Sequence, residues 1–421
     1  MKTTCVLYKP IEDVERIEHY RAGGYHPVKI GERFHNRYRM VHKLGHGTYS
    51  TVWLAQDEVS NRYVAVKVCT AGSSPRESNV LSRLSEPQRS PDTRRSMIPL
   101  LLDMFNTHGP NGDHNCLATT PARMSISEAK SGSWISLFQL EVARAIAAQL
   151  VIAVEYIHSQ GFVHGDLHCG NILFQLSFEF DHLSTETLYE KYGQPILEPV
   201  NRLDGKKLPP EVPQHGVIPV WLGKASEDLT LQEARILLSD FGEAFSPTEE
   251  QRYKSHTPLV VRPPEARFEP TKPLTFSSDI WTLGCTIWDI IAQRTLFEGF
   301  ITNEEDMSCQ QIELLGPLPI EWWEKWESYR KCLPENAMPI ERPKPFSQSW
   351  EDRFETNIQR PRIEEGMPSF EPSERRAFLS MLRWMLSFRP EDRPSAQQVL
   401  ESEWMVNRAL PEYEKIRNKQ L

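Results

Sequence analysis

Short stretches of alternating apolar and polar residues begin at Tyr38 and continue through the first third of the chain. Residues 64–68, Val-Ala-Val-Lys-Val, alternate with a period of two, which is typical of a β-strand. Residues 98–105 and 116–119 are apolar runs of the length expected for two more strands. The pattern therefore predicts a β-rich domain over residues 38–122.

Apolar positions with helical spacing dominate the chain beyond residue 123. The most apolar run, Leu137 to Ile157, is interrupted by three charged residues, so it predicts a buried helix and not a membrane span. Residues 279–291 predict a second apolar helix, and residues 372–415 read as closing helices. We therefore expect a larger, mainly helical domain over residues 123–405.

Three segments lack a regular apolar period, and residues 406–421 follow the helical domain as a tail. Residues 1–37 are a polar extension. Residues 123–135 are rich in Ser and Gly, which predicts a loose connection. Residues 175–230 carry several prolines and charged residues, which predicts a mostly loop insertion that is either functional or a disordered spacer.

The composition is that of a soluble globular protein. The chain has 421 residues, 39% of them hydrophobic and 25% charged, so it is long enough for two domains with cores of their own. Its formal net charge of −9 argues against a general nucleic-acid binder, which is usually basic. The charge is compatible with attraction of a basic substrate, and equally with solubility alone.

The cysteines and the N-terminus bear on the compartment. The seven cysteines are scattered without a C-x-x-C pair, which suits reduced thiols in the cytoplasm or nucleus. The first ten residues lack the apolar region of a signal peptide. We therefore expect a cytoplasmic or nuclear monomer that binds neither membrane nor nucleic acid directly.

Two motifs in the predicted helical domain carry the chemistry. Residues 164–171 read H-x-D-x-x-x-x-N, in which Asp166 can accept a hydroxyl proton and Asn171 can bind Mg²⁺. Downstream, Asp240 opens a D-F-G, whose aspartate holds Mg²⁺ against the phosphates of ATP. Each motif alone is weak, but their order behind a glycine-rich strand and a lysine makes them a strong combined signal.

The glycine-rich stretch follows the pattern G-x-G-x-x-S-x-V. Gly45 and Gly47 can let the backbone turn its amide N–H groups towards a phosphate, and Ser50 stands where a third glycine is common. Alone, such a stretch is more often an ordinary hairpin. The predicted nucleotide-binding residues of this stretch are Leu44, Gly45, His46, Gly47, Thr48, Tyr49, Ser50, Thr51 and Val52.

A lysine and a glutamate complete the expected nucleotide site. Lys67 ends a V-A-V-K strand, a variant of the V-A-I-K in which the lysine grips the α- and β-phosphates. Glu77, ten residues on, opens a stretch with Val80, Leu81 and Leu84 on one helical face. Glu77 is then the partner that holds Lys67 forward; a plain surface carboxylate is the alternative.

The segment from Asp240 to Glu265 reads as the activation and substrate-binding segment. It ends in Pro-Pro-Glu265, a variant of A-P-E, and Glu265 is expected to pair with Arg393 because a guanidinium matches a carboxylate bidentately. Asp279 can accept backbone N–H groups of the catalytic loop, or it can simply cap its helix.

Together these motifs resemble the eukaryotic protein kinase family over residues 38–405. In detail the chain is similar to the SR protein kinases, especially their fungal relatives. The resemblance implies an α+β, bilobal fold with a small β-rich N-terminal lobe and a large helical C-terminal lobe. It also implies a serine/threonine protein kinase that uses ATP and Mg²⁺, with Lys67, Asp166, Asn171 and Asp240 as catalytic residues.

Three features carry the closer likeness. The insertion lies between the catalytic loop and D-F-G, and Arg262-Pro263-Pro264-Glu265 stands where SR protein kinases have R-S-L-E. Residues 304–316 resemble their insert after the large apolar helix. The likeness implies phosphorylation of Ser in Arg/Ser-rich splicing factors, docked at Asp306 and Glu313, which share a helical face.

Three residues depart from this pattern. Arg294 falls near the position where SR protein kinases have a further docking aspartate, which implies weaker binding of basic peptides. His168 replaces the lysine that neutralises charge at the γ-phosphate. Gly165 replaces the arginine of H-R-D, so activation by phosphorylation of the activation segment is less expected.

Two other readings remain. The string H-G-D-L-H-x-G-N also resembles small-molecule phosphotransferases of the aminoglycoside and choline kinase type. Against them stand the P-P-E, the D-x-W-x-x-G helix and Arg393, which belong to the large lobe of protein kinases. A weakly active pseudokinase scaffold is the non-enzymatic reading, disfavoured because every catalytic residue type is present.

Overall fold

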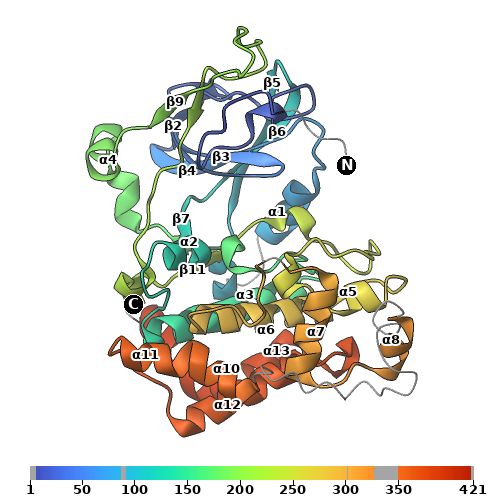
Figure 1. Ribbon diagram of the computed structural model, residues 1–421. Helices are drawn as coiled ribbons and strands as arrows, with labels where there is room; N and C mark the ends of the chain where they lie inside the picture. The colour runs from blue at the N-terminus through green and yellow to red at the C-terminus, as the bar shows by residue number, and fades with distance from the viewer. Residues whose placement is uncertain (1–5, 87–91, 301, 327–348, 419–421) are drawn as a thin grey trace. The chain divides into compact units, whose positions relative to one another are not determined.

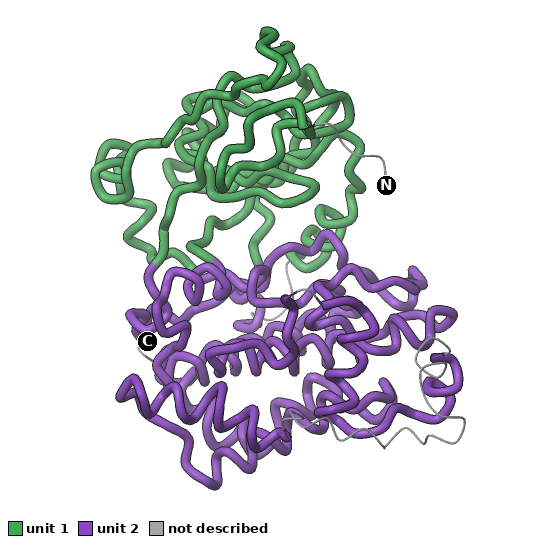
Figure 2. Tube along the Cα trace, viewed as in Figure 1, with its two compact units in different colours: residues 1–87, 99–124, 175–223 green, residues 88–98, 125–174, 224–421 purple. Residues whose placement is uncertain are grey.

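The computed structural model describes residues 6–86, 92–300, 302–326 and 349–418. The chain folds into two compact units, coloured separately in Figure 2. The first unit comprises residues 1–87, 99–124 and 175–223, and the second comprises residues 88–98, 125–174 and 224–421. Most of the segment expected as an insertion of the helical domain therefore belongs to the β-rich unit.

A six-stranded antiparallel sheet forms the first unit, in the order β1-β2-β3-β4-β6-β5 (Figure 1). The strands are β1 (Arg33–Phe34), β2 (Tyr38–Gly47), β3 (Ser50–Asp57), β4 (Arg62–Cys69), β5 (Leu101–Gly109) and β6 (Gly112–Thr119). Buried Val64, Val66 and Val68 of β4 pack in the core of this sheet with Met40 and Trp53. The period-two pattern of residues 64–68 thus predicted β4 correctly, and the apolar runs at residues 98–105 and 116–119 overlap β5 and β6. Helix α1 (Arg76–Ser85) contacts β5.

The insertion is mostly loop, as expected, but it also has short regular elements and packs on the sheet. It contains helix α4 (Thr185–Tyr192) and an antiparallel hairpin of β9 (Leu197–Pro199) and β10 (His215–Val217). Phe180, Leu188 and Leu222 are buried against side chains of β2, β3 and β4. Periodicity missed this packing because the apolar anchors are single residues separated by long polar stretches.

A second correction concerns residues 123–135, which were expected to be loose. Strand β7 (Ala122–Ser125) leads directly into helix α2 (Ile126–Ser131). The Ser125 hydroxyl accepts from the N–H of Glu128 at 3.1 Å, and the Glu128 carboxylate accepts from the N–H of Ser125 at 2.6 Å. This capping box starts the helix, and its S-x-x-E signature was readable in a stretch dominated by Ser and Gly.

The second unit is built around helix α3 (Leu140–Ser159), which is buried on nearly all its faces. Helices α6, α13 and α14 pack against α3. A short β8 (Ile172–Gln175) pairs antiparallel with β11 (Ile236–Leu238). The other helices, in chain order, are α5 (Glu265–Phe268), α6 (Phe276–Ile291), α7 (Glu304–Leu315), α8 (Ile320–Lys325), α10 (Trp350–Phe354), α11 (Arg360–Glu364), α12 (Pro372–Met385), α13 (Ala396–Leu400) and α14 (Leu410–Asn418).

A cluster of aromatic residues and the C-terminal helix complete this unit. Trp322, Trp323 and Trp326 are buried with Phe268 in a packed apolar cluster. The expected tail is helical up to Asn418, and its Ile416 is buried. None of the helices among the described residues has the length and apolar character needed to cross a membrane.

A buried histidine of the N-terminal extension makes the first unit sensitive to acid. His26 is 6% exposed, its ring lies 4.9 Å from that of His114, and its Nδ1 is buried without a hydrogen-bond partner. Burial, and secondarily His114, lower the pKa of His26 to about 4. Below pH 6.5 this histidine is therefore protonated in the unfolded chain, whereas in the folded protein it stays neutral down to about pH 4. The free energy of unfolding consequently falls as the pH drops from 6.5 towards 4.

We predict that His26→Phe reduces this acid sensitivity. Between pH 7 and pH 5 the wild-type protein should lose about 2 kcal/mol of unfolding free energy through His26, and the variant should not. Urea unfolding at the two pH values measures the difference. His108→Asn, at an exposed position, is the matched control and should behave like the wild type. Equal pH dependence of wild type and His26→Phe would contradict the prediction.

Candidate active site

In the first unit, the predicted lysine–glutamate pair is formed. Lys67 on β4 places its Nζ 2.7 Å from the Glu77 Oε2 in the first turn of α1, and the side chains are only 19% and 12% exposed. Val80, Leu81 and Leu84 are the buried face of α1, which turns Glu77 to its partner. Glu77 is therefore the expected partner of Lys67 and not the alternative, a plain surface carboxylate, because the apolar face fixes the rotation of the helix.

The glycine-rich stretch is a hairpin between β2 and β3, with Thr48 and Tyr49 at its tip. Neither Gly45 nor Gly47 has a positive φ, and a Cβ added to either would meet open space. The fold of this unit therefore does not itself require glycine here. The open space leaves room for a ligand to approach the backbone closely, which only residues without side chains permit.

In the second unit, one buried carboxylate holds the catalytic loop. Asp279 of α6 accepts from the N–H of His164 at 2.7 Å and of Gly165 at 3.0 Å. The His158 Nε2 lies 3.0 Å from the same carboxylate. Helix α6 begins at Phe276 after the N-cap Thr275, so Asp279 is not the capping residue. Of its two predicted roles, the structure shows the contact with the loop.

The ring of His164 connects this loop to the D-F-G segment. Its Nδ1 accepts from the N–H of Asp166 at 3.3 Å, so its Nε2 carries the proton and donates to the carbonyl of Ser239 at 3.0 Å. Burial lowers the pKa of His164, which keeps the ring neutral in this arrangement. Sequence reasoning gave His164 no role beyond its place in the motif.

The predicted catalytic groups of this unit converge. The Asn171 Nδ2 donates to the Asp166 carbonyl at 2.9 Å and lies 3.3 Å from the Asp166 Oδ2. The Asn171 carbonyl accepts from the N–H of Ser239 at 2.8 Å, directly before Asp240. This follows from the strand register, because Ile172 of β8 is opposite Leu238 of β11. The structure thus brings Asp166, Asn171 and Asp240 to one place.

The donor set fits a proton-accepting base and a hard divalent cation. The Asp166 Oδ1 is buried without a hydrogen-bond partner, so it is available to a substrate hydroxyl. Asp240, with φ of +61°, presents an exposed carboxylate, and Asn171 offers an amide oxygen. Among the described residues, no group of three His, Cys, Asp or Glu could hold a metal. Two protein oxygens plus substrate phosphates are how proteins usually bind Mg²⁺.

The structure explains the two departures within the catalytic loop. The His168 Nδ1 accepts from the N–H of Gly170 at 3.1 Å, so Nε2 bears the proton and lies 3.6 Å from the Asp166 Oδ2. Gly165 has φ of +78°, and a Cβ there would lie 2.8 Å from the Glu243 carbonyl oxygen. An arginine at position 165 therefore does not fit this backbone.

The activation segment is anchored from within. Arg252 lies 3.0 Å from the Glu243 carboxylate and 2.7 Å from that of Glu250, and its guanidinium stacks 5.5 Å from the centre of the Phe245 ring. Sequence reasoning missed Arg252, since it belongs to no motif of fixed spacing. The ion pairs of Arg252 lie within the activation segment, which Gly165 cannot contact through a side chain.

The predicted pair at the end of this segment is formed and buried. Both guanidinium nitrogens of Arg393 lie 2.7 Å from the two Glu265 oxygens. Arg393 also donates to the carbonyls of Ser277 at 2.9 Å and Phe388 at 2.9 Å. Its guanidinium covers the Trp281 ring at 5.0 Å. The pair therefore joins the activation segment to α6 and to the segment before α13.

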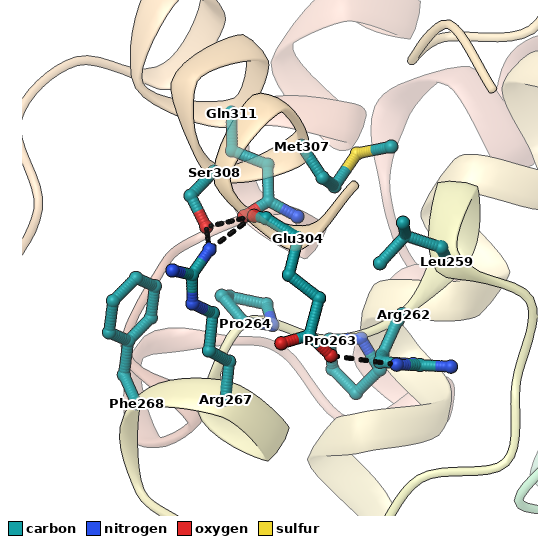
Figure 3. A pocket seen from close by; sticks show the side chains of 10 residues that line it. All are labelled: Leu259, Arg262, Pro263, Pro264, Arg267, Phe268, Glu304, Met307, Ser308 and Gln311. Atoms are coloured by element: carbon teal, nitrogen blue, oxygen red, sulfur yellow. Dashed lines mark hydrogen bonds and ion pairs between the residues drawn. The ribbon is translucent and has the colours of Figure 1, made fainter. Parts of the chain in front are cut away.

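A pocket lies between this end of the segment and α7, with Leu259, Pro263 and Met307 among its lining residues (Figure 3). Arg262 is 3.2 Å from the Glu304 carboxylate (Figure 3). Arg267 lies 2.8 Å from the Glu305 carboxylate. Two acidic residues at the start of α7 are thus paired within the protein.

The expected docking residues lie further along α7. Asp306 is exposed, and its carboxylate accepts from the N–H of Asn303 at 3.4 Å as part of a capping box. Glu313 is half-buried on the same helix, two turns later. The carbonyl of Arg294, which stands where a docking aspartate was expected, accepts from the Trp288 Nε1 at 3.1 Å.

Comparison with known proteins agrees with this geometry. The protein kinase domain matches residues 38–180 and 226–405, and the chain therefore belongs to the protein kinase family. The matched ranges omit residues 181–225, which hold most of the insertion. A crystal structure of a kinase domain has the same fold, with a TM-score of 0.60 and 20% identity, covering 90% of this chain and 98% of its own.

Relatives in sequence are serine/threonine kinases. One from Aspergillus fumigatus is 26% identical over 408 residues, which cover 93% of this chain and 90% of the relative. The protein kinase dsk1 of Schizosaccharomyces pombe is 38% identical over 38% of this chain and 30% of its own. Human SRSF protein kinase 3 is 32% identical over 49% of this chain and 37% of its own. The expected likeness to SR protein kinases is confirmed.

We predict that Glu265→Gln destabilises the second unit strongly. The change leaves the Arg393 guanidinium, whose side chain is 0% exposed, without its counter-charge. Breaking a buried pair in this way costs roughly 3–5 kcal/mol. Urea unfolding measures the loss. Glu304→Gln is the matched control, since its ion pair with Arg262 is exposed and should cost at most about 1 kcal/mol. Equal effects of the two changes would contradict the prediction.

Proposed function

We propose that this protein transfers the γ-phosphoryl group of Mg²⁺-bound ATP to serine or threonine hydroxyls of protein substrates. The observation that carries the proposal is the convergence of Asp166, Asn171 and Asp240, with the Asp166 Oδ1 buried and without a partner. An aspartate so placed can accept the proton of an incoming hydroxyl.

Each residue then has a defined task. Asp166 orients the substrate hydroxyl and takes its proton at Oδ1, while Asn171 holds the other oxygen at 3.3 Å. Asn171 and Asp240 would hold the cation, which would neutralise charge on the phosphates. Lys67, held by Glu77 at 2.7 Å, binds phosphate oxygens. Catalysis rests on positioning and charge stabilisation without a covalent enzyme intermediate.

The remaining predicted nucleotide contacts are on the hairpin of β2 and β3. Leu44 to Val52 surround the open backbone at Gly45 and Gly47, where amide N–H groups can approach phosphates. Lys67 faces Val52 across β3 and β4, so the lysine and the hairpin belong to one sheet. This register supports a shared role of the two motifs in binding ATP.

For the substrate, we infer proteins rich in Arg and Ser. Human SRSF protein kinase 3 is among the relatives, the net charge of this chain is −9, and Asp306 and Glu313 offer carboxylates on α7. Guanidinium groups pair well with such carboxylates. We further propose that the protein acts as a monomer in the cytoplasm or nucleus.

We predict that Asp166→Ala lowers the rate of phosphoryl transfer steeply and leaves nucleotide binding largely intact. Removing a general base typically costs 10²- to 10⁴-fold in rate, and Asp166 makes no proposed contact with ATP. Radiolabel transfer to an Arg/Ser peptide measures activity, and a thermal-shift titration with Mg-ATP measures binding. Asp113→Asn, at a side chain that is 82% exposed, is the control.

The same assay separates the other readings. Full activity of Asp166→Ala would contradict the proposed base. Transfer by the wild type to choline or an aminoglycoside, and not to peptide, would favour a small-molecule phosphotransferase. Binding of Mg-ATP without transfer to any acceptor would favour a pseudokinase.

We predict that the double change Asp306→Asn/Glu313→Gln weakens binding of basic peptide. Each lost pairing is worth up to about 1 kcal/mol, so KM for an Arg/Ser peptide should rise by roughly five- to tenfold, with kcat little changed. Asn at 306 retains an acceptor for the capping box. Steady-state kinetics with the Arg/Ser peptide, and with a peptide whose arginines are replaced by Gln, measure the effect.

Glu364→Gln, an exposed change on α11, is the control and should leave both KM values unchanged. An equal rise of KM for the basic and the neutral peptide would show that the two carboxylates do not select for arginine.

A further inference from the structure

The N-terminal extension and the insertion, to which the sequence assigned no specific role, pack against each other. Tyr8 and Arg202 form an antiparallel bridge, the N–H of Lys9 donates to the Asn201 carbonyl at 2.9 Å, and the N–H of Leu203 donates to that of Leu7 at 2.9 Å. We call residues 7–28 and 199–217 together the brace.

The brace has its own apolar core. Buried Ile17 and Tyr20 of the extension pack with Val200 and Val212 of the insertion. The Asn111 Nδ2, in the turn between β5 and β6, donates to the carbonyls of Tyr25 at 2.6 Å and Glu211 at 3.0 Å, so it ties both halves to the sheet. The brace is therefore a packed part of the first unit.

One phenol of the brace reaches the tip of the glycine-rich hairpin. Tyr25 is 3% exposed, and its hydroxyl donates to the Gly47 carbonyl at 2.7 Å and lies 3.1 Å from the Thr48 carbonyl. Burial, and secondarily Glu15, raise the pKa of Tyr25 to about 12, so the phenol remains a donor at neutral pH.

The direction of these bonds matters for the hairpin. In a trans peptide, the N–H points away from the C=O of the same unit. Because Tyr25 holds the carbonyls of Gly47 and Thr48 on the brace side, the N–H groups of Thr48 and Tyr49 are directed to the opposite side. That is the orientation an anion-binding hairpin needs.

A buried ion pair fixes the base of the same hairpin. Lys43 of β2 is 0% exposed, and its Nζ contacts a carboxylate oxygen of Glu15, whose other oxygen accepts from the Tyr20 hydroxyl. The pairing of β2 with β3 is irregular between Lys43 and Gly45, directly beside this ion pair. Bulges of this kind redirect a strand, often next to a functional site.

We propose that the brace positions the glycine-rich hairpin for ATP, with Tyr25 and the Glu15–Lys43 pair as positioning residues. The inference rests on the proposed function, because it takes phosphate binding as the role of the hairpin. A buried ion pair gives little net stability, which favours a geometric role for Glu15 and Lys43. The extension and the insertion thereby act on the nucleotide without touching it.

Tyr25→Phe tests the proposal by removing one oxygen. Losing a single hydrogen bond should raise the Kd and the KM for ATP by roughly two- to tenfold, with kcat and the KM for peptide changed less than about twofold. Tyr189→Phe is the matched control, since its hydroxyl donates to the Val41 carbonyl of the same strand at 3.0 Å, away from the hairpin tip. The control should leave the KM for ATP unchanged.

The double change Glu15→Leu/Lys43→Met is an independent test that leaves no charge unpaired. It should also raise the Kd for ATP, while a thermal melt shows that the protein is folded. Glu15→Gln alone leaves the Lys43 charge buried and should lower the melting temperature, so it is not used as the kinetic test.

The outcomes separate the two claims. If wild-type protein binds Mg-ATP and transfers phosphate, but Tyr25→Phe and the double variant bind ATP as the wild type does, the brace proposal is overturned and the proposed function stands. If the wild type binds no Mg-ATP, the proposed function fails, and the role of the brace fails with it. A selective rise in the Kd for ATP, absent in Tyr189→Phe, supports the proposal.

Discussion

The second unit depends on one carboxylate. Asp279 is 1% exposed and takes two backbone N–H groups of the catalytic loop on its two oxygens. It thereby fixes the backbone at His164 and Gly165. The neutral His164 ring in turn donates to the carbonyl of Ser239, which precedes Asp240. A buried charge that accepts several hydrogen bonds is stable where it is and costly to move. The positions of Asp166 and Asp240 follow from this arrangement.

The first unit solves a different problem. Its sheet carries Lys67 on β4 and, between β2 and β3, a hairpin with open space beside Gly45 and Gly47. The α1 helix holds Lys67 through Glu77, and the rotation of that helix is set by three buried residues. The hairpin is held by Tyr25 of the N-terminal extension, which in turn packs with residues of the insertion.

Much of this could be read from the sequence, for identifiable reasons. Strands, the long helix and the pairs Lys67–Glu77 and Glu265–Arg393 follow from periodicity and from motifs whose spacing reflects chemistry. The packing of the insertion could not be predicted, because Phe180, Leu188 and Leu222 are buried by side chains of β2, β3 and β4, which are distant in the sequence. Tyr25 and Arg252 were missed for the same reason, since each acts through a contact that no local pattern encodes.

Gly165 has a consequence for control of the enzyme. Its left-handed backbone lies against the Glu243 carbonyl and leaves no room for a side chain, so this loop offers no guanidinium to receive a phosphate added to the activation segment. Arg252 nearby is already engaged by two glutamates. A phosphate added to the activation segment by another kinase would therefore have no arginine of the catalytic loop to bind.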